Sequence, residues 1–283
     1  MKRLLLSIAI GLGSLTATST MAATPAFSAQ KIAQTKLSNL SFKQIMRDLY
    51  SSQMTRAFVN DEAIESLPHV GLGAEKGGEQ TVAVMHPIIR YPSSTGQTRY
   101  LVVIEKLKVY ANNGSLVSCH ACSAKADLYS FKRLSNGQYQ LVSKSVPNLK
   151  LSSSWGRIQF DAEEIRNGIQ PLGKNLVGSI FSNGYTSTGT SETWWDVLHL
   201  PENDFINVYK LGDAGGDNSG NYEETSPLYY SYESTYQVLP QNSSYYPIKL
   251  TYVGDKPTDD YKRVKTINYS VTKTFNSAKK QYQ

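Results

Sequence analysis

The chain has 283 residues, a formal net charge of +6, 40% hydrophobic residues and only 2 cysteines. This length suits one large β domain or two small ones, and it is enough to bury a sizeable core. The charge is mild and the basic residues are scattered among acidic ones, whereas a nucleic-acid surface needs clustered Lys and Arg with stacking aromatic residues. We therefore expect no nucleic-acid partner.

Residues 1–22 have the composition of a secretory signal peptide. Lys2 and Arg3 form a basic start, residues 4–12 are apolar, and Thr20-Met21-Ala22 offers a cleavage site with small residues. The apolar run is too short for a spanning helix, and no later segment is long and apolar enough to be one. We predict a periplasmic or secreted product with no transmembrane segment after cleavage. An uncleaved amphipathic anchor is the alternative interpretation.

The next two segments differ in character. Residues 23–40 begin with small and polar side chains and are predicted to be a flexible leader. Ser41 then has the character of an N-cap, and apolar residues recur at helical spacing from Phe42 to about Ala57. This pattern predicts an amphipathic helix within a helical segment, residues 41–68, that Pro68 ends.

Residues 69–283 are predicted to form a β domain. Segments rich in Val, Ile, Tyr and Thr follow one another, and many alternate apolar with polar residues. Asn112-Asn113-Gly114 and Ser135-Asn136-Gly137 are typical of hairpin turns, and residues 184–189 (GYTSTG) are a third candidate hairpin tip. No expected helix is long enough for a βαβ crossover. The predicted fold class is mainly β, an antiparallel sandwich or bent meander with one N-terminal amphipathic helix.

Cys119 and Cys122 stand on either side of His120. In an exported chain a C-x-x-C pair is most simply a local disulfide, which we predict here. A redox cysteine needs a helix N-terminus, whereas the flanking residues 115–118 and 125–131 have strand character. A zinc site would need further ligands, because the sequence has no second C-x-x-C. A thiol-redox or other enzyme that uses Cys119, His120 and Cys122 remains an alternative.

Residues 213–224 read DAGGDNSGNYEE. Side chains with oxygen atoms occupy positions one, five, seven, nine and twelve of this segment, a spacing that suits a hard cation such as calcium. Positions three and six depart from an EF-hand, so a flexible polar hairpin loop is the favoured alternative. The candidate calcium ligands are Asp213, Asp217, Ser219, Asn221 and Glu224.

The chain has 19 tyrosines and 3 tryptophans, more than a core of this size needs. Cross-strand ladders account for many of them, and exposed members would form a protein- or glycan-binding face. Consecutive residues of a strand point to opposite sides, so of the two adjacent tryptophans one is expected in the core and the other either outside or buried under the helix. The candidate binding residues are Trp194, Trp195, Tyr229, Tyr230 and Tyr232.

The sequence has neither a G-x-S-x-G nor an H-E-x-x-H motif, so we predict no catalytic residues and lean against an enzyme. We expect an exported, non-enzymatic binding protein of the cell envelope. An inhibitor or immunity-type protein is one form of this function, with an envelope or secreted protein as its partner. A calcium-dependent glycan or cell-wall binding protein is the other alternative, and calcium is the one cofactor considered.

The order of several short motifs resembles a group of uncharacterised exported Gram-negative proteins. The resemblance covers roughly residues 80–283 and implies no particular activity. No cysteine follows the fourth motif here, so a further disulfide at that place is absent. The motifs are Cys119-His120-Ala121-Cys122, Ser154-Trp155-Gly156, GYTSTG at residues 184–189, Asp217-Asn218-Ser219-Gly220 and a closing segment over residues 275–282.

Overall fold

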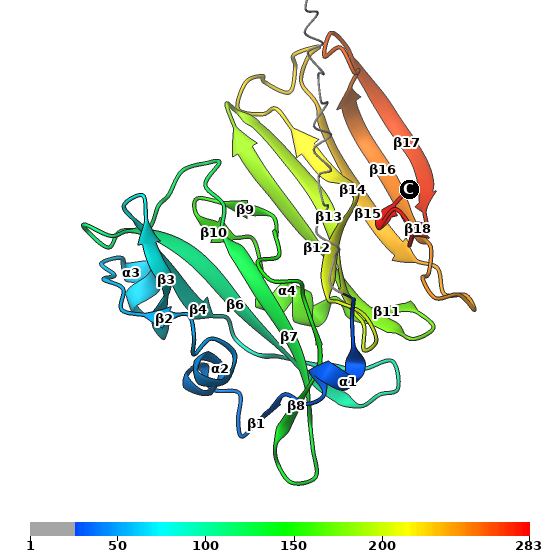
Figure 1. Cartoon of the computed structure of the whole chain (residues 1–283). Helices are drawn as coiled ribbons and strands as arrows, with labels where there is room; N and C mark the ends of the chain where they lie inside the picture. The colour runs from blue at the N-terminus through cyan, green and yellow to red at the C-terminus, as the bar shows by residue number, and fades with distance from the viewer. Residues whose placement is uncertain (1–25) are drawn as a thin grey trace, which may run out of the picture.

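The computed structural model describes residues 26–283, and the chain in it is mainly β, with two large antiparallel sheets, two two-stranded ones and four short helices in this range (Figure 1). The predicted fold class is therefore confirmed. The predicted signal peptide, residues 1–22, lies outside the described residues. Within residues 26–283, no helix has the length and apolar character needed to cross a membrane.

The first sheet has eight strands in the order β1-β8-β7-β6-β4-β3-β2, and β5 also pairs with β6. The long strand β6 lies at its centre, because both β4 and β7 pair along it. The strands are β1 (Lys36–Leu37), β2 (Met54–Thr55), β3 (His69–Lys76), β4 (Glu79–Met85), β5 (Ile89–Pro92), β6 (Thr98–Tyr110), β7 (Lys125–Arg133) and β8 (Tyr139–Lys144).

Both faces of the first sheet are buried. One face packs against the N-terminal segment, which contains α1 (Ala29–Ile32), α2 (Phe42–Leu49) and α3 (Glu62–Glu65). Ile45 and Met46 of α2 meet Val102 and Ile104 of β6 there, and the Ser41 side chain caps α2 by accepting from the N–H of Gln44. The alternation of β6 places its other apolar side chains in the core between the sheets.

Two expectations for the N-terminal segment are wrong. The described part of the leader is ordered, because Ile32, Leu37 and Leu40 are buried against the first sheet and β1 pairs with β8. These spaced apolar residues are hard to recognise within a polar stretch. The helix predicted to reach Ala57 ends at Leu49, since the chain turns and pairs β2 with β3.

The second sheet has seven strands in the order β11-β12-β13-β14-β15-β16-β17, which is also the chain order. The sheet curls, because the N–H groups of Lys174 and Tyr246 bond across to the carbonyls of Ser243 and Leu172, which joins β11 to the β15–β16 connection. Its strands are β11 (Ile169–Gly173), β12 (Leu176–Ser187), β13 (Thr190–Leu200), β14 (Asn207–Asp217), β15 (Ser231–Val238), β16 (Ile248–Pro257) and β17 (Val264–Lys273).

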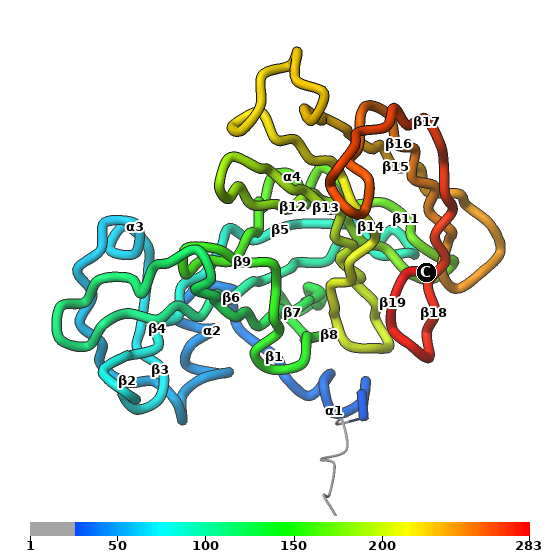
Figure 2. The backbone as a smooth tube through the Cα atoms, turned by 90° about the horizontal axis from the view of Figure 1, so that it is seen from above, coloured from blue at the N-terminus to red at the C-terminus, as the bar shows by residue number. Residues whose placement is uncertain are grey.

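The two sheets share one apolar core. Val103 and Leu128 of the first sheet belong to the same buried cluster as Phe181 and Leu198 of the second, while Leu250 lies in a separate cluster inside the curl. Seen from above, the first sheet lies on the left and the curled sheet on the right (Figure 2). The small elements between and after them are β9 (Ser153–Ser154), β10 (Arg157–Ile158), α4 (Ala162–Asn167), β18 (Phe275–Asn276) and β19 (Gln281–Tyr282).

Candidate binding surface

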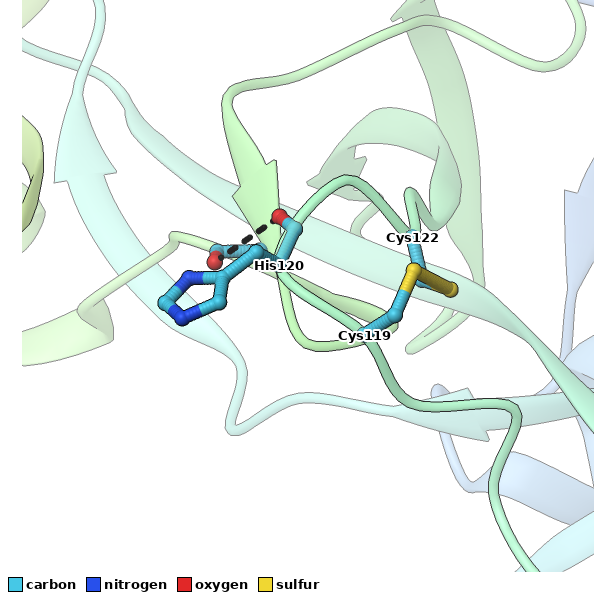
Figure 3. The surroundings of a disulfide bond; sticks show 4 residues. Cys119, His120 and Cys122 are labelled. Atoms are coloured by element: carbon cyan, nitrogen blue, oxygen red, sulfur yellow. Dashed lines mark hydrogen bonds between the residues drawn. A yellow bond between two sulfur atoms is a disulfide. The ribbon is translucent and has the colours of Figure 1, made fainter. Parts of the chain in front are cut away.

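The predicted disulfide between Cys119 and Cys122 is present. It closes a tight turn in which the Cys122 N–H donates to the Cys119 carbonyl over 2.9 Å. The expected strand over residues 125–131 is confirmed as part of β7, whereas the one expected over residues 115–118 is wrong, since these residues belong to the loop after β6 and form only an isolated bridge at Leu116. Neither cysteine lies at a helix N-terminus, the setting that lowers a thiol pKa. His120 points away from the disulfide (Figure 3).

The disulfide turn holds the β9–β10 hairpin. The N–H groups of Trp155 and Gly156 donate to the carbonyls of Cys119 and Cys122 over 3.1 and 2.9 Å. Trp155 has a φ of 54° and Gly156 a φ of 76°, and a Cβ on Gly156 would collide with the carbonyl oxygen of Val117. The turn thus requires glycine at one position and strains the tryptophan at the other.

A buried ion pair anchors the other end of this hairpin. Glu105 of β6 is fully buried and accepts from Arg157 Nε and Nη2 at 3.1 and 2.9 Å. It also accepts from the Ile158 N–H at 2.7 Å and lies 2.9 Å from His86 Nε2. Burial alone would raise the pKa of Glu105, but the hydrogen bonds from His86, Arg157 and Ile158 hold this pKa below its ordinary value. The hairpin is therefore fixed to the first sheet.

Trp155 forms one wall of a cleft of about 620 Å³, which we call the Trp155 cleft. The indole is 51% exposed and packs on the His120 ring with 4.1 Å between ring centroids. Across the cleft lies the outer part of β12, and the Gln159 amide reaches it by donating to the Gly184 carbonyl at 2.5 Å. The cleft is lined by His120, Ser154, Trp155, Gln159, Gly184, Tyr185, Thr186, Ser191 and Thr193.

A second cleft, of about 340 Å³, lies on the other side of β13, and we call it the Trp194 cleft. Thr193 lines both clefts, and Tyr185 of the first lies 6.1 Å from Trp194 of the second, measured between ring centroids. The two clefts are therefore neighbours. The main side chains of the Trp194 cleft are Glu192, Trp194, Lys210, Asp213, Tyr230, Tyr232, Lys256 and Tyr261.

Three of the five predicted binding residues, Trp194, Tyr230 and Tyr232, meet in this second cleft. Trp195 instead packs on Tyr236 inside the curl and donates to the Ser234 hydroxyl at 2.9 Å. One tryptophan thus belongs to a core and its neighbour to a cleft. Tyr229 is half-buried and lines neither cleft.

Two lysines offset part of the negative charge that lines the second cleft. Lys256 Nζ lies 3.0 Å from Asp213 Oδ2 and 4.7 Å from the centre of the Tyr232 ring. Burial lowers the pKa of Lys256, but its hydrogen bond and charge attraction to Asp213 outweigh this and raise the pKa above its ordinary value. Lys210 lies over the Trp194 ring at 5.3 Å. Each lysine cation thus lies over an aromatic ring, and the attraction between cation and ring stabilises this arrangement.

The five candidate calcium ligands are not brought together. Asp213 and Asp217 belong to the extended strand β14, so the four residue steps from one to the other separate them by roughly 13 Å. Asp213 pairs with Lys256, while Asp217 accepts from the Ser219 N–H and hydroxyl. Among residues 26–283, no three His, Cys, Asp or Glu side chains are grouped as a metal site. The other candidate ligands are Asn221, which bonds to the Thr188 carbonyl, and the exposed Glu224.

The motifs that are spread over residues 119–220 converge on one surface. The third and fourth motifs touch, because the Gly220 N–H donates to the Gly189 carbonyl at 3.1 Å at the predicted hairpin tip between β12 and β13. We call the two clefts and this tip the rim. Trp155, Tyr185 and Tyr261 line the rim although they are not among the binding residues predicted from the sequence, and for Trp155 the Ser154-Trp155-Gly156 motif was the available signal.

Comparison of the chain with protein-family models, curated proteins and solved structures gave no match.

Proposed function

We propose that the chain is an exported, non-enzymatic binding protein of the cell envelope, which recognises another protein through the rim. The convergence of four distant segments on one surface with exposed aromatic side chains is the observation that carries this proposal. Aromatic residues dominate the energetics of protein interfaces, because they bury a large area at a small cost in side-chain entropy.

Backbone strain at the rim supports the same function. Trp155 and Tyr261 both have positive φ, 54° and 55°, and are 51% and 66% exposed. A non-glycine residue in this conformation costs of order 1–3 kcal/mol, and an exposed large side chain recovers little of that by packing. Strain that displays an aromatic ring to solvent is best explained by a partner that covers the ring.

The rim is also pre-organised. The disulfide turn and the Glu105–Arg157 pair fix Trp155 from two sides. Just below the tip, Tyr185 of β12 donates to its cross-strand neighbour Glu192 of β13 at 2.8 Å. A surface that is ordered before it binds loses less conformational entropy on association, which strengthens binding.

An inhibitor or immunity-type protein that guards against a secreted toxin is the form of this function that we propose first. It agrees with the predicted signal peptide and with a periplasmic or secreted location. The proposed partner is an envelope or secreted protein, and recognition of such a partner requires no cofactor.

The test is capture from envelope extract followed by a measurement of affinity with the purified partner. We expect Trp155→Gly and Tyr261→Gly each to weaken binding at least tenfold, because each removes an aromatic side chain of the proposed interface. Neither substitution removes a side chain that packs in the core. Tyr269→Ala is the matched control, since Tyr269 is a 43% exposed aromatic residue of β17 that lines neither cleft. Equal affinity for all three variants and the wild type would refute the proposal.

A glycan is a second candidate ligand, supported by the Trp194 cleft. Trp194 and Tyr232 offer aromatic surface next to paired charges, and sugars bind through such surfaces and polar groups. Since Asp213 already pairs with Lys256, we expect this binding to be independent of calcium. Calorimetry with soluble cell-wall fragments, with and without a chelator, tests this candidate. It fails if Trp194→Ala binds the fragments as the wild type does.

A further inference from the structure

The outer part of β12 is an open strand edge. β11 pairs with β12 only between Leu176 and Ser179, and within residues 26–283 no other strand pairs with β12 on that side. The opposite side pairs with β13 over the whole length up to the Ser187–Thr190 pair. The backbone of residues 180–187 therefore has one side without a neighbouring strand.

Two side chains show which backbone groups point outward. The Ser182 N–H donates to Glu164 Oε1 at 2.9 Å, and the Gly184 carbonyl accepts from Gln159 Nε2 at 2.5 Å. In a strand, the N–H and the C=O of one residue point to the same side, and successive residues alternate. Ser182, Gly184 and Thr186 therefore all present their backbone groups to the open side.

These side chains imitate a neighbouring strand. A carboxylate oxygen accepts where a partner carbonyl would accept, and an amide nitrogen donates where a partner N–H would donate. They satisfy one group of Ser182 and one of Gly184, while no hydrogen bond from the described residues reaches the outward N–H or C=O of Thr186. Gly184 and Thr186 both line the Trp155 cleft, so this edge opens into it.

We propose that the partner contributes an extended peptide segment, which adds to the open edge of β12 inside the Trp155 cleft. This inference rests on the proposed function. Unpaired backbone groups in register select another extended backbone, whereas a helix or a glycan has no matching row of donors and acceptors. Residues 184–187, beyond the Glu164 contact with Ser182, are about 13 Å long at the usual rise per residue, which fits a segment of about four residues.

The facing wall indicates which side chains this segment carries. Trp155 and His120 form a continuous aromatic surface beside the edge. Side chains of an added strand alternate in direction, so every second residue of the segment faces this wall. The segment therefore carries an aromatic or large aliphatic side chain at alternate positions.

The first experiment selects peptides from a phage-displayed library of random linear sequences on the purified protein. We expect enriched peptides with alternating apolar residues that bind wild-type protein and lose at least tenfold in affinity for Thr186→Pro. Proline removes the outward N–H of Thr186 and leaves the pairing with β13 intact. Thr186→Val is the matched control, because it keeps this N–H and loses only the hydroxyl, which lies 3.0 Å from the Ser191 hydroxyl.

A second measurement does not depend on folding of the proline variant. The selected peptide is synthesised with N-methyl groups at alternate amides, in both possible phases, and titrated against wild-type protein. Strand addition predicts that methylation in one phase abolishes binding and methylation in the other phase preserves it. Failure to enrich any peptide, or equal binding of both methylated forms, overturns the inference.

The captured partner separates this inference from the proposed function. Partner binding that falls with Trp155→Gly but not with Thr186→Pro would retain the rim as the binding surface and reject strand addition. An affinity for the partner that is unchanged by Trp155→Gly would reject the proposed function itself.

Discussion

The two sheets use their surfaces differently. The first sheet is covered on both faces, and its internal charges are paired, as Glu105 is with Arg157 and Asp127 is with Lys106. The second sheet buries its base and the inside of its curl, while its far end and the adjacent β9–β10 hairpin carry the exposed aromatic residues of the rim. Stability and recognition are therefore located in different parts of the chain, so substitutions should separate them.

The largest expected loss of stability comes from removal of Glu105, which fixes the β9–β10 hairpin of the rim to the first sheet. Glu105→Ala leaves Arg157, His86 and the Ile158 N–H without their shared acceptor, and loss of one partner from a buried ion pair costs about 3–5 kcal/mol. Urea denaturation measures this loss. Glu79→Ala is the control, because its 3.8 Å pair with Lys108 is exposed and worth at most about 1 kcal/mol. Equal losses would show that the anchor is not a stabilising element.

The next largest effect is the loss of folding stability at acid pH that a buried histidine of the second sheet causes. His199 is buried among Tyr209, Tyr245 and Tyr282, and burial lowers its pKa to about 3. The unfolded chain binds a proton near pH 6.5 and the folded chain does not, so stability falls as the pH drops from 6.5 towards 3.

Unfolding free energies across this pH range provide the measurement. His199→Phe should flatten the dependence, whereas the exposed His69→Gln should leave it unchanged. A wild-type slope in the His199→Phe variant would contradict the assignment.

The disulfide should contribute less to the free energy of unfolding. Replacement of both Cys119 and Cys122 by serine opens a ring of four residues, for which loop entropy predicts a loss of about 2 kcal/mol. Partner binding should also weaken, because the carbonyls of both residues hold the Trp155 turn. Thermal unfolding with and without reductant gives the first effect. Turnover in a disulfide-reductase assay by wild-type protein, lost in the serine variant, would instead support the redox alternative.

The smallest expected change in stability is at Trp155, where the contributions to binding and to stability separate most clearly. Trp155→Gly loses the contact with His120 but relieves the strain at φ 54°, so the free energy of unfolding should change by less than about 1 kcal/mol. Trp195→Gly is the contrast, because this indole packs inside the curl and its loss should cost about 3 kcal/mol or more. A large loss for Trp155→Gly would mean that the rim also stabilises the fold.

The sequence by itself determined the features that depend on local chemistry. Alternating apolar residues and Asn-Gly turns indicated the antiparallel β class, and the spacing of Cys119 and Cys122 indicated their disulfide. Ser41 marked the start of α2 through its capping side chain. Each signal operates within a few residues, so it can be read without knowledge of distant contacts.

Only the tertiary structure decided how the segments combine. Burial of Leu37 and Leu40 against the first sheet ordered a stretch whose composition predicted flexibility, and pairing of β2 with β3 ended a helix whose periodicity continued. The extended path of β14 separated Asp213 from Asp217, although their spacing suited a loop. The rim depends on strand pairing over long sequence separations, because such contacts assemble residues whose local patterns are unrelated.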